Sequence, residues 1–467
     1  MVKNEEKIGV VLSLGMNGEG VIKDEDTIVF VPFALEGEKI RYKILKVTKK
    51  CAYGKLLEVI TPAEERVRPK CPVFTKCGGC QLQHLKYTSE LAIKEKNVKT
   101  CFKKIALIDV DVKPTIKGES DYFYRNKLQL PVSDSENGAV IGFYAENSHR
   151  VVPITDCTIN GEWAKSVIKA FKVYFERFGI KGYNEEKHSG EIREVTAKEI
   201  GKKLIITVVT LTEKLPCKNE LIEILSSEID GEFSLYQNVN SNKTNVIYGD
   251  NFKLLYGKGE YSSEMFSIKY KIGVRSFMQV NPVVCAKLYS AVRDCLNIDE
   301  NTTVIDAYSG AGLMTALLAS NSKKAIGIEI ISEAVNIAND LAKDNGLDNK
   351  IKNYCGKCED LLPKIVEEER KNGQVALVLD PPRKGVDIKV IKAIVDSKID
   401  RIAYVSCMPS TLARDIGLLV GTLKEQNGEI VKVENPTLRY DIEFIRPFDM
   451  FPQTKHIETL VCLNRKK

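Results

Sequence analysis

The sequence predicts an α/β protein in three parts: a small β-barrel, a central β-rich domain and a C-terminal doubly wound domain over residues 271–467. Three observations lead to this prediction. Short apolar stretches separated by glycine turns fill residues 7–60, strand-like segments dominate from 120 to about 270, and from about 283 apolar strands alternate with amphipathic helices. Such alternation is typical of a mostly parallel sheet covered by helices. A chain of 467 residues is also too long for one hydrophobic core.

The predicted barrel occupies residues 1–61. The stretch IGVVLSLGMNGEGVI has two apolar runs around a glycine-rich turn, and the following residues alternate between apolar and basic positions. Several short strands broken by glycine turns fit an oligonucleotide-binding fold, and they also fit a small barrel without a ligand. Residues 62–270 form the predicted central domain. In it, a cysteine-dense linker and a basic helix over 85–107 precede several strands and one helix around 163–178.

Charge is distributed unevenly along the chain. The net charge is +6, but residues 41–130 contain 20 Lys and Arg against 9 Asp and Glu, so the remainder is net acidic. A basic segment of this kind favours a polyanionic partner, most simply a nucleic acid; the alternative is a solvated lysine-rich surface.

The location of the protein is predicted from two absences in the sequence. No apolar run reaches the length of a membrane span, and the N-terminal MVKNEEKIGV has no apolar signal core. We therefore expect a cytoplasmic protein with no membrane partner. Thirteen cysteines in that compartment are not expected to form a disulfide framework, so tight spacings among them indicate metal or catalytic sites.

The stretch VIDAYSGAGLM predicts a strand, a glycine-rich turn and a helix. Gly310 and Gly312 let the backbone approach a ligand at the helix N-terminus. The third glycine of the dinucleotide fingerprint is replaced by Thr315, which disfavours NAD. Glu329 at the end of the next strand suits two ribose hydroxyls, and Asp360, one strand later, suits an adenine amino group. Together these features indicate S-adenosylmethionine.

Asp380 in LVLDPPRKG closes a predicted buried strand, and the two prolines after it constrain the turn. Methyltransferases that act on exocyclic amines often have Asn or Asp, two prolines and then an aromatic residue at this point. Arg383 stands in the aromatic position. A methyltransferase acting on another kind of atom is therefore favoured.

Cys407 in YVSCMPSTLARD ends another strand predicted for the same sheet, so it is expected beside Asp380 on the ligand face. Carbon 5 of uracil is a poor nucleophile, and a thiolate added to carbon 6 activates it as an enolate. That carbon can then attack a sulfonium methyl group. We expect the helix after Cys407 to lower the pKa of the thiol through its dipole. Plain packing of a buried thiol is the alternative.

The mechanism also needs a base, because the carbon 5 proton must leave before the thiolate can be expelled. The C-terminal stretch FDMFPQTKHIETLVCL places His456 and Glu458 just before a final apolar strand. Either side chain can act as a base, and either residue at a strand start is more often simply part of the surface.

The stretches DPPRKG, VSCMPSTLARD and DMFPQTKHIETLVCL resemble the motifs of the RNA uracil-5-methyltransferases. The resemblance covers nearly the whole chain and is closest to the iron–sulfur-containing 23S rRNA 5-methyluridine methyltransferases. It implies that Cys407 is the nucleophile and Glu458 the base. Met408 stands where the family has asparagine, and we do not expect this change to abolish activity.

The resemblance further implies residues for the cofactor and a role for each domain. Cofactor-binding positions are matched by Gln279 in SFMQVN, Tyr308, Glu329 and Asp380, and more loosely by Asp360. The N-terminal barrel resembles a TRAM domain and is expected to bind RNA through backbone charge. The target uridine must leave any stack to reach the thiol, so a flipped base is expected, and Phe277 is a candidate to stack on it. We expect a monomer whose RNA partner is 23S rRNA.

A cluster of cysteines lies in the central domain. Cys71, Cys77 and Cys80 have the spacing C-x5-C-x2-C with two glycines between the last two, and ITDCTIN offers Cys157 as a fourth ligand. Four thiolates can hold zinc or a [4Fe–4S] cluster. The spacing resembles that of the rRNA uracil methyltransferases, which implies the [4Fe–4S] cluster, with a structural or RNA-folding role because methyl transfer needs no electron.

Other cysteines and histidines are interpreted as packing. Cys355 and Cys358 form a lone C-x2-C pair with no second pair near it, and His84, His149 and His188 occur singly. Three other functions are weighed: the same chemistry on a tRNA uridine, an iron–sulfur oxidoreductase, and a non-catalytic RNA-binding protein. Members of the resembled family that act on tRNA generally lack the cluster and the N-terminal barrel, which favours rRNA here.

Overall fold

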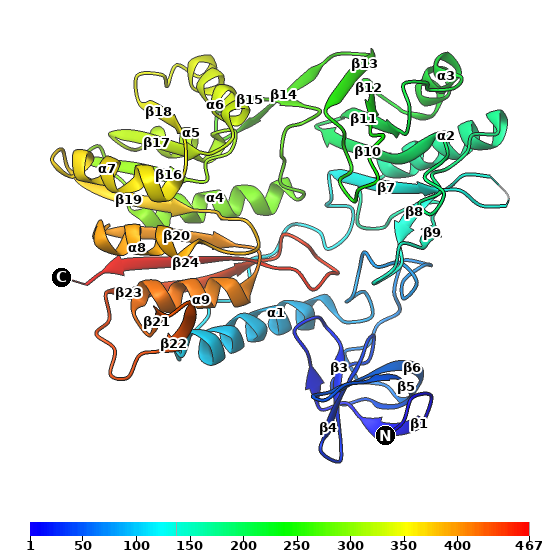
Figure 1. The fold of residues 1–467 in the computed structure, drawn as a ribbon, viewed down its shortest axis with the longest axis horizontal. Coiled ribbons are helices and arrows are strands. Elements are labelled where there is room, and N and C mark those ends of the chain that lie inside the picture. The colour runs from blue at the N-terminus through cyan, green and yellow to red at the C-terminus, as the bar shows by residue number, and fades with distance from the viewer. Residues whose placement is uncertain (137, 467) are drawn as a thin grey trace. The chain divides into compact units, whose positions relative to one another are not determined.

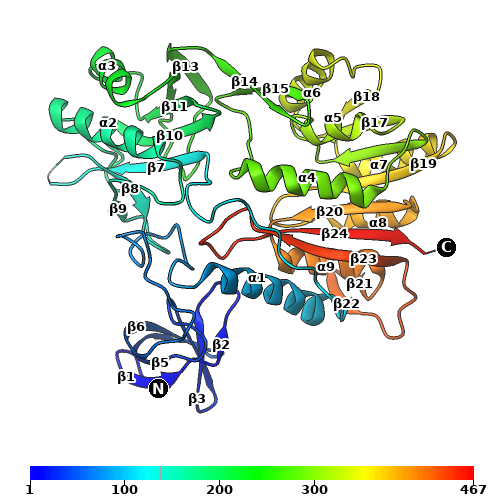
Figure 2. The same cartoon turned by 180° about the vertical axis from the view of Figure 1, so that it is seen from behind.

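The computed structural model describes residues 1–136 and 138–466 and divides into two compact units (Figures 1 and 2). Each unit is built from separate stretches of the chain. Unit 1 consists of Met1–Ile93, Ser120–Tyr261 and Phe451–Lys455, and unit 2 consists of Lys94–Glu119, Ser262–Met450 and His456–Lys467. The three-domain division expected from the sequence, with boundaries near 61 and 270, stays a prediction.

The N-terminal strands form one six-stranded sheet in unit 1, in the order β1-β5-β6-β4-β3-β2. The strands are β1 (Glu6–Val10), β2 (Ser13–Leu14), β3 (Gly20–Asp24), β4 (Thr27–Val31), β5 (Lys39–Val47) and β6 (Ala52–Thr61). Apolar residues on one face, among them Val29, Ile40 and Tyr42, form its core. The expected closed barrel is not found among the described strands: β1 and β2 are the two ends of the sheet, and β2, only two residues long, pairs with β3 alone.

A second sheet of seven strands in unit 1 has the order β13-β12-β11-β10-β7-β8-β9. Its strands are β7 (Lys127–Ser133), β8 (Val140–Tyr144), β9 (Val151–Pro153), β10 (Ile192–Ile200), β11 (Lys203–Thr210), β12 (Phe233–Val239) and β13 (Asn251–Tyr256). The predicted helix is α2 (Trp163–Phe178), but the expectation of a single helix is wrong. A further helix, α3 (Lys218–Glu228), buries Leu221, Ile224 and Leu225, whose helical spacing was overlooked in a strand-rich region.

Unit 2 contains the predicted doubly wound sheet, in the order β18-β17-β16-β19-β20-β24-β23. The first five strands in this order, from β18 to β20, are parallel to one another, and β24 runs antiparallel to both β20 and β23. The strands are β16 (Thr302–Ala307), β17 (Lys324–Glu329), β18 (Ile351–Cys355), β19 (Gln374–Leu379), β20 (Arg401–Ser406), β23 (Tyr440–Phe448) and β24 (Glu458–Arg465). The strand order reverses between β16 and β19, and ligands bind beyond the carboxyl ends of the strands at such a point.

The remaining elements connect or cover these sheets. The hairpins are β14 (Glu260–Met265) with β15 (Ile268–Gly273), and β21 (Leu423–Gln426) with β22 (Glu429–Lys432); the helices are α1 (Tyr87–Cys101), the π-helical turn η1 (Phe102–Ala106), α4 (Pro282–Leu296), α5 (Leu313–Ala319), α6 (Ser332–Asp344), α7 (Cys358–Arg370), α8 (Ile388–Asp396) and α9 (Pro409–Val420). The basic helix predicted over 85–107 is therefore confirmed as α1 and η1. No helix in the described part of the chain is long and apolar enough to cross a bilayer.

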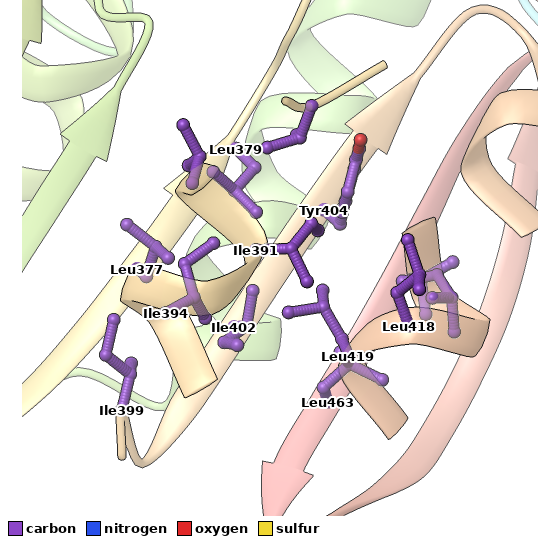
Figure 3. Packing of buried hydrophobic residues seen from close by; sticks show 14 of the residues in the cluster. Leu377, Leu379, Ile391, Ile394, Ile399, Ile402, Tyr404, Leu418, Leu419 and Leu463 are labelled. Carbon is purple, nitrogen blue, oxygen red and sulfur yellow. The ribbon is translucent and has the colours of Figure 1, made fainter. Parts of the chain in front are cut away.

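Helices α8 and α9 cover one face of the unit 2 sheet. Figure 3 shows Ile391 and Ile394 of α8 and Leu419 of α9 directed at Ile402 and other apolar residues of β19, β20 and β24. All of these side chains are buried. Dense packing of this kind holds the strand ends rigidly, which is what a site built at those ends requires.

Candidate active site

The residues predicted for chemistry lie at one edge of the unit 2 sheet. Tyr308, Asp380 and Cys407 each come directly after one of three adjacent parallel strands, β16, β19 and β20, and Glu329 ends β17. Glu458 begins β24, which runs antiparallel to β20, so it lies at the same edge. Carboxyl ends of parallel strands meet in this way in doubly wound folds, so the sequence prediction of a shared edge is confirmed.

Cys407 and Glu458 are neighbours across two strands. Ser406 of β20 pairs with Thr459 of β24 in antiparallel register. Cys407, which follows Ser406, therefore lies opposite Glu458, which precedes Thr459. Both Glu458 and Asp380 act electrostatically on the Cys407 thiol, and the Arg383 guanidinium acts on it through its charge and as a hydrogen-bond donor. The structure therefore brings the predicted nucleophile, the predicted base and the Asp380 carboxyl together.

The expected lowering of the thiol pKa is wrong. Burial raises the pKa of Cys407 above its usual value, Glu458 and Asp380 raise it further, and Arg383 acts in the opposite direction. Loss of hydration is the largest of these causes. The sequence analysis did not place Arg383 beside the thiol, where the structure has it. The signal was available, because a cation replaced the aromatic residue in DPPR.

The pKa values of the carboxyls at the site are raised. Burial, with Asp380 as a further cause, raises the pKa of Glu458 well above its usual range. Asp380 reaches solvent at the mouth of the site, yet the protein atoms around it and the Asp306 carboxyl raise its pKa to about 7. Buried Asp306 has a pKa of about 6. Like charges this close favour sharing of protons.

Asp306 and Thr315 explain the departure from the dinucleotide fingerprint. Thr315 Oγ1 donates a hydrogen bond to Asp306 Oδ2 at 2.6 Å, and both side chains are buried. A glycine at position 315 would leave the Asp306 carboxylate without this donor. An aspartate inside the apolar stretch TTVIDA was the signal that could have identified this residue.

The loop after β16 is shaped to admit a ligand. Tyr308, Gly310 and Gly312 all have left-handed backbone angles, with φ of 76°, 52° and 82°. A Cβ on Gly312 would lie 2.7 Å from Cβ of Ala338 in α6, so this glycine permits close helix packing. A Cβ on Gly310 would meet nothing within 4 Å, so there is open space over the loop at this point.

Glu329 is tied to this loop. Its Oε2 accepts a hydrogen bond from Gly310 N at 3.1 Å, and its Oε1 accepts one from Ile331 N at 2.9 Å. Asp360 lies exposed in the first turn of α7, directly after β18 and thus at the same edge of the sheet. Gln279 precedes α4, whose N-cap Asn281 is buried and has a side-chain NH₂ group with no partner among the described residues.

A buried carboxylate braces the loop that carries Asp380 and Arg383. Asp415 of α9 accepts hydrogen bonds from Val386 N at 2.8 Å and from the Tyr404 hydroxyl at 2.6 Å. A Cβ on Gly385 would lie 2.4 Å from Asp415 Oδ2, so only glycine permits this approach. The Asp-Pro-Pro loop is therefore attached to the helix that follows Cys407.

The start of α9 accommodates Met408. Its side chain cannot cap the helix, and the Met408 N–H instead donates to Ser406 Oγ at 3.1 Å. Pro409 at the first helical position needs no partner for its nitrogen. The backbone beside Cys407 is thus satisfied without the asparagine that Met408 replaces.

The four cysteines proposed as ligands gather in unit 1. The thiols of Cys71, Cys77 and Cys157 act electrostatically on that of Cys80, and burial with these neighbours raises its pKa. Gly79 N–H points at Cys77 Sγ at 3.3 Å. However, no group of three or more Cys, His, Asp or Glu among the described residues has metal-binding geometry.

Several other predictions about cysteines and histidines can be compared with the structure. Cys358 is buried as expected, but Cys355 is exposed, so its interpretation as packing is wrong. His84 is buried between Phe33 and Phe74, as a packing residue would be. Cys295 of α4 and Cys462 of β24 form the one disulfide in the described chain. A single bridge is not a disulfide framework.

Comparisons with known proteins agree with this geometry. A family model described as tRNA (Uracil-5-)-methyltransferase matches residues 256–466. An uncharacterized RNA methyltransferase of Clostridium acetobutylicum is 39% identical over 99% of this chain and 98% of its own, and one of Halalkalibacterium halodurans is 38% identical with the same coverage. The solved Pyrococcus abyssi tRNA (uracil-54, C5)-methyltransferase, in complex with S-adenosyl-L-homocysteine, is 25% identical, covers 98% of this chain and 100% of its own, and has a TM-score of 0.74.

The site and the comparisons lead to the same assignment. A relative aligns at 39% identity over almost the full length of both chains, and the family match spans Cys407, Glu458 and Asp380. The chain belongs to the RNA methyltransferase family of uracil-5-methyltransferases and is a transferase.

Proposed function

We propose that this enzyme methylates carbon 5 of a uridine in 23S rRNA, with S-adenosylmethionine as the methyl donor. The observation that carries the proposal is the grouping of Cys407, Glu458, Asp380 and Arg383 at one edge of the sheet. The chain belongs to a family of transferases. This membership argues against the two other functions considered from the sequence, an iron–sulfur oxidoreductase and a non-catalytic RNA-binding protein.

Cys407 begins the reaction as a thiolate. Its sulfur forms a bond to carbon 6 of the uracil, and the electrons of the 5,6 double bond move toward the carbonyl oxygen at carbon 4. The positive charge of Arg383 acts on the thiol and stabilises its anionic form. S-adenosylmethionine, when bound, supplies a methyl group on a sulfonium, which is transferred to carbon 5.

Glu458 completes the reaction as the base. Its carboxylate takes the proton from carbon 5, the 5,6 double bond forms again, and the bond between carbon 6 and the Cys407 sulfur breaks. Burial and Asp380 raise the pKa of Glu458, so its carboxylate is a stronger base than one in water. The elevated pKa of Asp380, about 7, leaves it able to donate a hydrogen bond to the uracil.

The cofactor would lie over the loop after β16, at the reversal of strand order. Open space beside Gly310 and the Glu329 carboxylate support this position, as does the unpartnered NH₂ group of Asn281 next to the predicted Gln279. Tyr308 and Asp380 are the first residues of the loops that follow β16 and β19, the two strands on either side of the reversal. Asp360 extends the same edge toward the adenine.

The cysteines support a [4Fe–4S] cluster held by Cys71, Cys77, Cys80 and Cys157. The evidence in favour is the mutual proximity of the four thiols and the N–H groups directed at two of them, Gly79 N at Cys77 and Ile159 N at Cys157. Iron, when bound, would draw the thiols together and deprotonate them. We assign the cluster a structural role.

The N-terminal sheet is proposed to hold RNA as a TRAM domain does. Its outer face carries Lys39, Arg41 and Lys43 on β5 and Lys55 on β6, and none of these four is buried. Backbone phosphates are recognised by charge of this kind without regard to sequence. A monomer acting in the cytoplasm remains our expectation.

A tRNA uridine is the second candidate. The solved relative that aligns with 98% of this chain is named as a tRNA enzyme, and the matched family model carries the same word. The rRNA proposal depends on the resemblance of the cysteine spacing to that of the rRNA enzymes. Substrate choice therefore requires a direct measurement.

The test uses RNA that contains 5-fluorouridine. Fluorine at carbon 5 cannot leave as a proton, so the covalent intermediate should persist on a denaturing gel. Large-subunit rRNA fragments and tRNA transcripts are each incubated with protein and S-adenosylmethionine. We expect an rRNA adduct that is absent with Cys407→Ala and present with Cys217→Ala, which changes an exposed cysteine. An adduct on tRNA alone would establish the second candidate, and no adduct on either would contradict the mechanism.

A further inference from the structure

A groove in unit 2 lies outside the candidate active site. It has a volume of about 490 Å³ and is lined by Lys287, Ser290 and Asp294 of α4 and by Phe444, Arg446 and Phe448 of β23, among others. Its volume falls within the usual range of ligand sites. None of the residues assigned to catalysis or to the cofactor lines it.

The groove is positively charged. No carboxylate among the described residues forms an ion pair with Lys287 or Arg446, and Lys287 Nζ donates only to the backbone oxygen of Lys117 at 2.9 Å. The acid on its wall, Asp294, is already paired with Arg293 at 3.0 Å. The Nε atom of Arg446 is buried and has no hydrogen-bond partner in the described structure. Two cations are therefore available to an anion.

An aromatic ring lies beside these cations. Phe444 is partly exposed, and the Arg446 guanidinium lies 5.4 Å from the centre of its ring. Exposed aromatic rings next to Arg and Lys are the common means of holding single-stranded RNA, because bases stack on the ring and phosphates contact the cations. The combination fits a nucleotide better than an apolar or a purely anionic ligand.

The register of β23 places the groove close to the reaction. Phe448 pairs with Glu458, the proposed base, and Arg446 and Phe444 follow at successive alternate positions opposite Leu460 and Cys462. At about 3.4 Å per residue, Arg446 lies about 7 Å along the strand from Phe448. That is about the reach of one nucleotide from the target uridine.

We propose that this groove binds a nucleotide of the RNA substrate that flanks the target uridine. Lys287 and Arg446 hold its phosphate, and Phe444 provides the ring against which its base stacks. This inference rests on the proposed function and adds to it a second contact that positions the RNA strand.

The first experiment measures affinity for a single-stranded RNA of about a dozen nucleotides with a central 5-fluorouridine, by fluorescence anisotropy over a range of salt concentrations. Lys287→Gln with Arg446→Gln should weaken binding about fivefold and lower the salt slope by about 0.7 for the lost phosphate contact. Lys392→Gln, an exposed lysine of α8, is the control and should change neither. Equal affinity and slope in all proteins would overturn the proposal.

Two further variants guard against misfolding. Lys287 is exposed, so Lys287→Gln alone tests the charge without disturbing the core, and Phe444→Leu tests stacking while keeping an apolar side chain. Photocrosslinking from 5-bromouridine one or two positions from the target should label β23 in the wild type and be lost in Phe444→Leu. Label elsewhere only would overturn the assignment.

Different measurements test this inference and the proposed function: affinities and crosslinks test the groove, and adduct formation tests the reaction. Adduct formation at saturating RNA should be unchanged in Lys392→Gln, because this control residue lies outside both the groove and the candidate active site. If the wild type forms no adduct, the proposed reaction fails, while the affinities and crosslinks still decide whether the groove binds RNA.

Discussion

At the scale of single residues, the charge state of Cys407 depends on three neighbours. Glu458 and Asp380 raise the pKa of the thiol and Arg383 lowers it, on a background of burial that favours the neutral form. Addition to uracil requires the thiolate. Of the three neighbours, Arg383 is the one that favours the thiolate.

The first prediction concerns the pH dependence of adduct formation. The rate should rise with pH, because only the deprotonated thiol reacts and its pKa is raised. Arg383→Gln should move the half-maximal pH upward by about one unit, since a favourable charge is lost. Arg383→Lys, which keeps the charge, should move it less. Adduct yield with 5-fluorouridine RNA between about pH 7 and 10 gives the profile. Identical profiles in all three proteins would show that Arg383 does not stabilise the thiolate.

The second prediction concerns His84. Burial lowers its pKa to about 3, and Arg66 contributes. The unfolded chain takes up a proton near pH 6.5 and the folded one does not, so this contribution to stability is present above pH 6.5 and is lost as pH falls toward 3. Between pH 7 and 5 the wild type should lose about 2 kcal/mol more than His84→Phe in urea unfolding. His149→Phe, at an exposed position, is the control and should behave as the wild type.

At the scale of elements, α1 is fastened to unit 2 by a buried ion pair. Lys94 Nζ lies 2.7 Å from Asp449 Oδ1, and the two side chains are 2% and 0% exposed. Val98 and Cys101 on the same helix enter the core of the unit. Asp449 follows Phe448, the residue opposite Glu458, so this pair also holds the end of β23 beside the proposed base.

The third prediction compares two ion pairs on one helix. Lys94→Ala removes a buried cation from beside the buried Asp449 carboxylate and should lower the free energy of unfolding by about 3–5 kcal/mol. Lys99→Ala breaks the ion pair between Lys99 and Asp111, whose side chains are 47% and 99% exposed. This variant should change the free energy of unfolding little. Urea denaturation at neutral pH measures both. Similar losses in the two variants would contradict a structural role for the buried pair.

At the scale of the whole molecule, the chain leaves β23, passes through unit 1 and returns to unit 2 at the proposed base. The five residues Phe451–Lys455 belong to unit 1. The backbone oxygen of Gln453 accepts hydrogen bonds from Gln81 N at 3.1 Å and Leu82 N at 3.0 Å, directly after the cysteine motif. Order in the cysteine segment is therefore expected to support the segment that precedes Glu458.

The fourth prediction tests that connection. Cys71→Ser should lose iron and its visible absorbance, lower Tm, and increase hydrogen exchange in residues 451–455, because the segment that bonds to Gln453 loosens. Iron analysis, thermal unfolding and exchange mass spectrometry measure these effects, with Cys217→Ser as the control. If exchange in 451–455 stays at the wild-type level while iron is lost, the cluster does not support this segment.

The strand ends were predictable because local patterns determine them. Apolar runs ending at Asp380, Cys407 and Glu329 indicate strands of one parallel sheet, and parallel strands present their carboxyl ends at a common edge whatever the rest of the chain does. The helices α1, α2 and α4 were predictable for the same reason, from periodicity within one segment. Helix α3 was missed because its short apolar pattern lies in a strand-rich region.

The sequence by itself therefore determined the doubly wound domain, the sheet edge that carries the candidate site and the residues that gather there. Only the tertiary structure decided the direction of the thiol pKa shift, the position of Arg383 beside that thiol, the pairing of Thr315 with Asp306 and the open form of the N-terminal sheet. Each of these depends on groups from different strands and loops. Burial and through-space charge arise from contacts distant in sequence, so no local pattern records them.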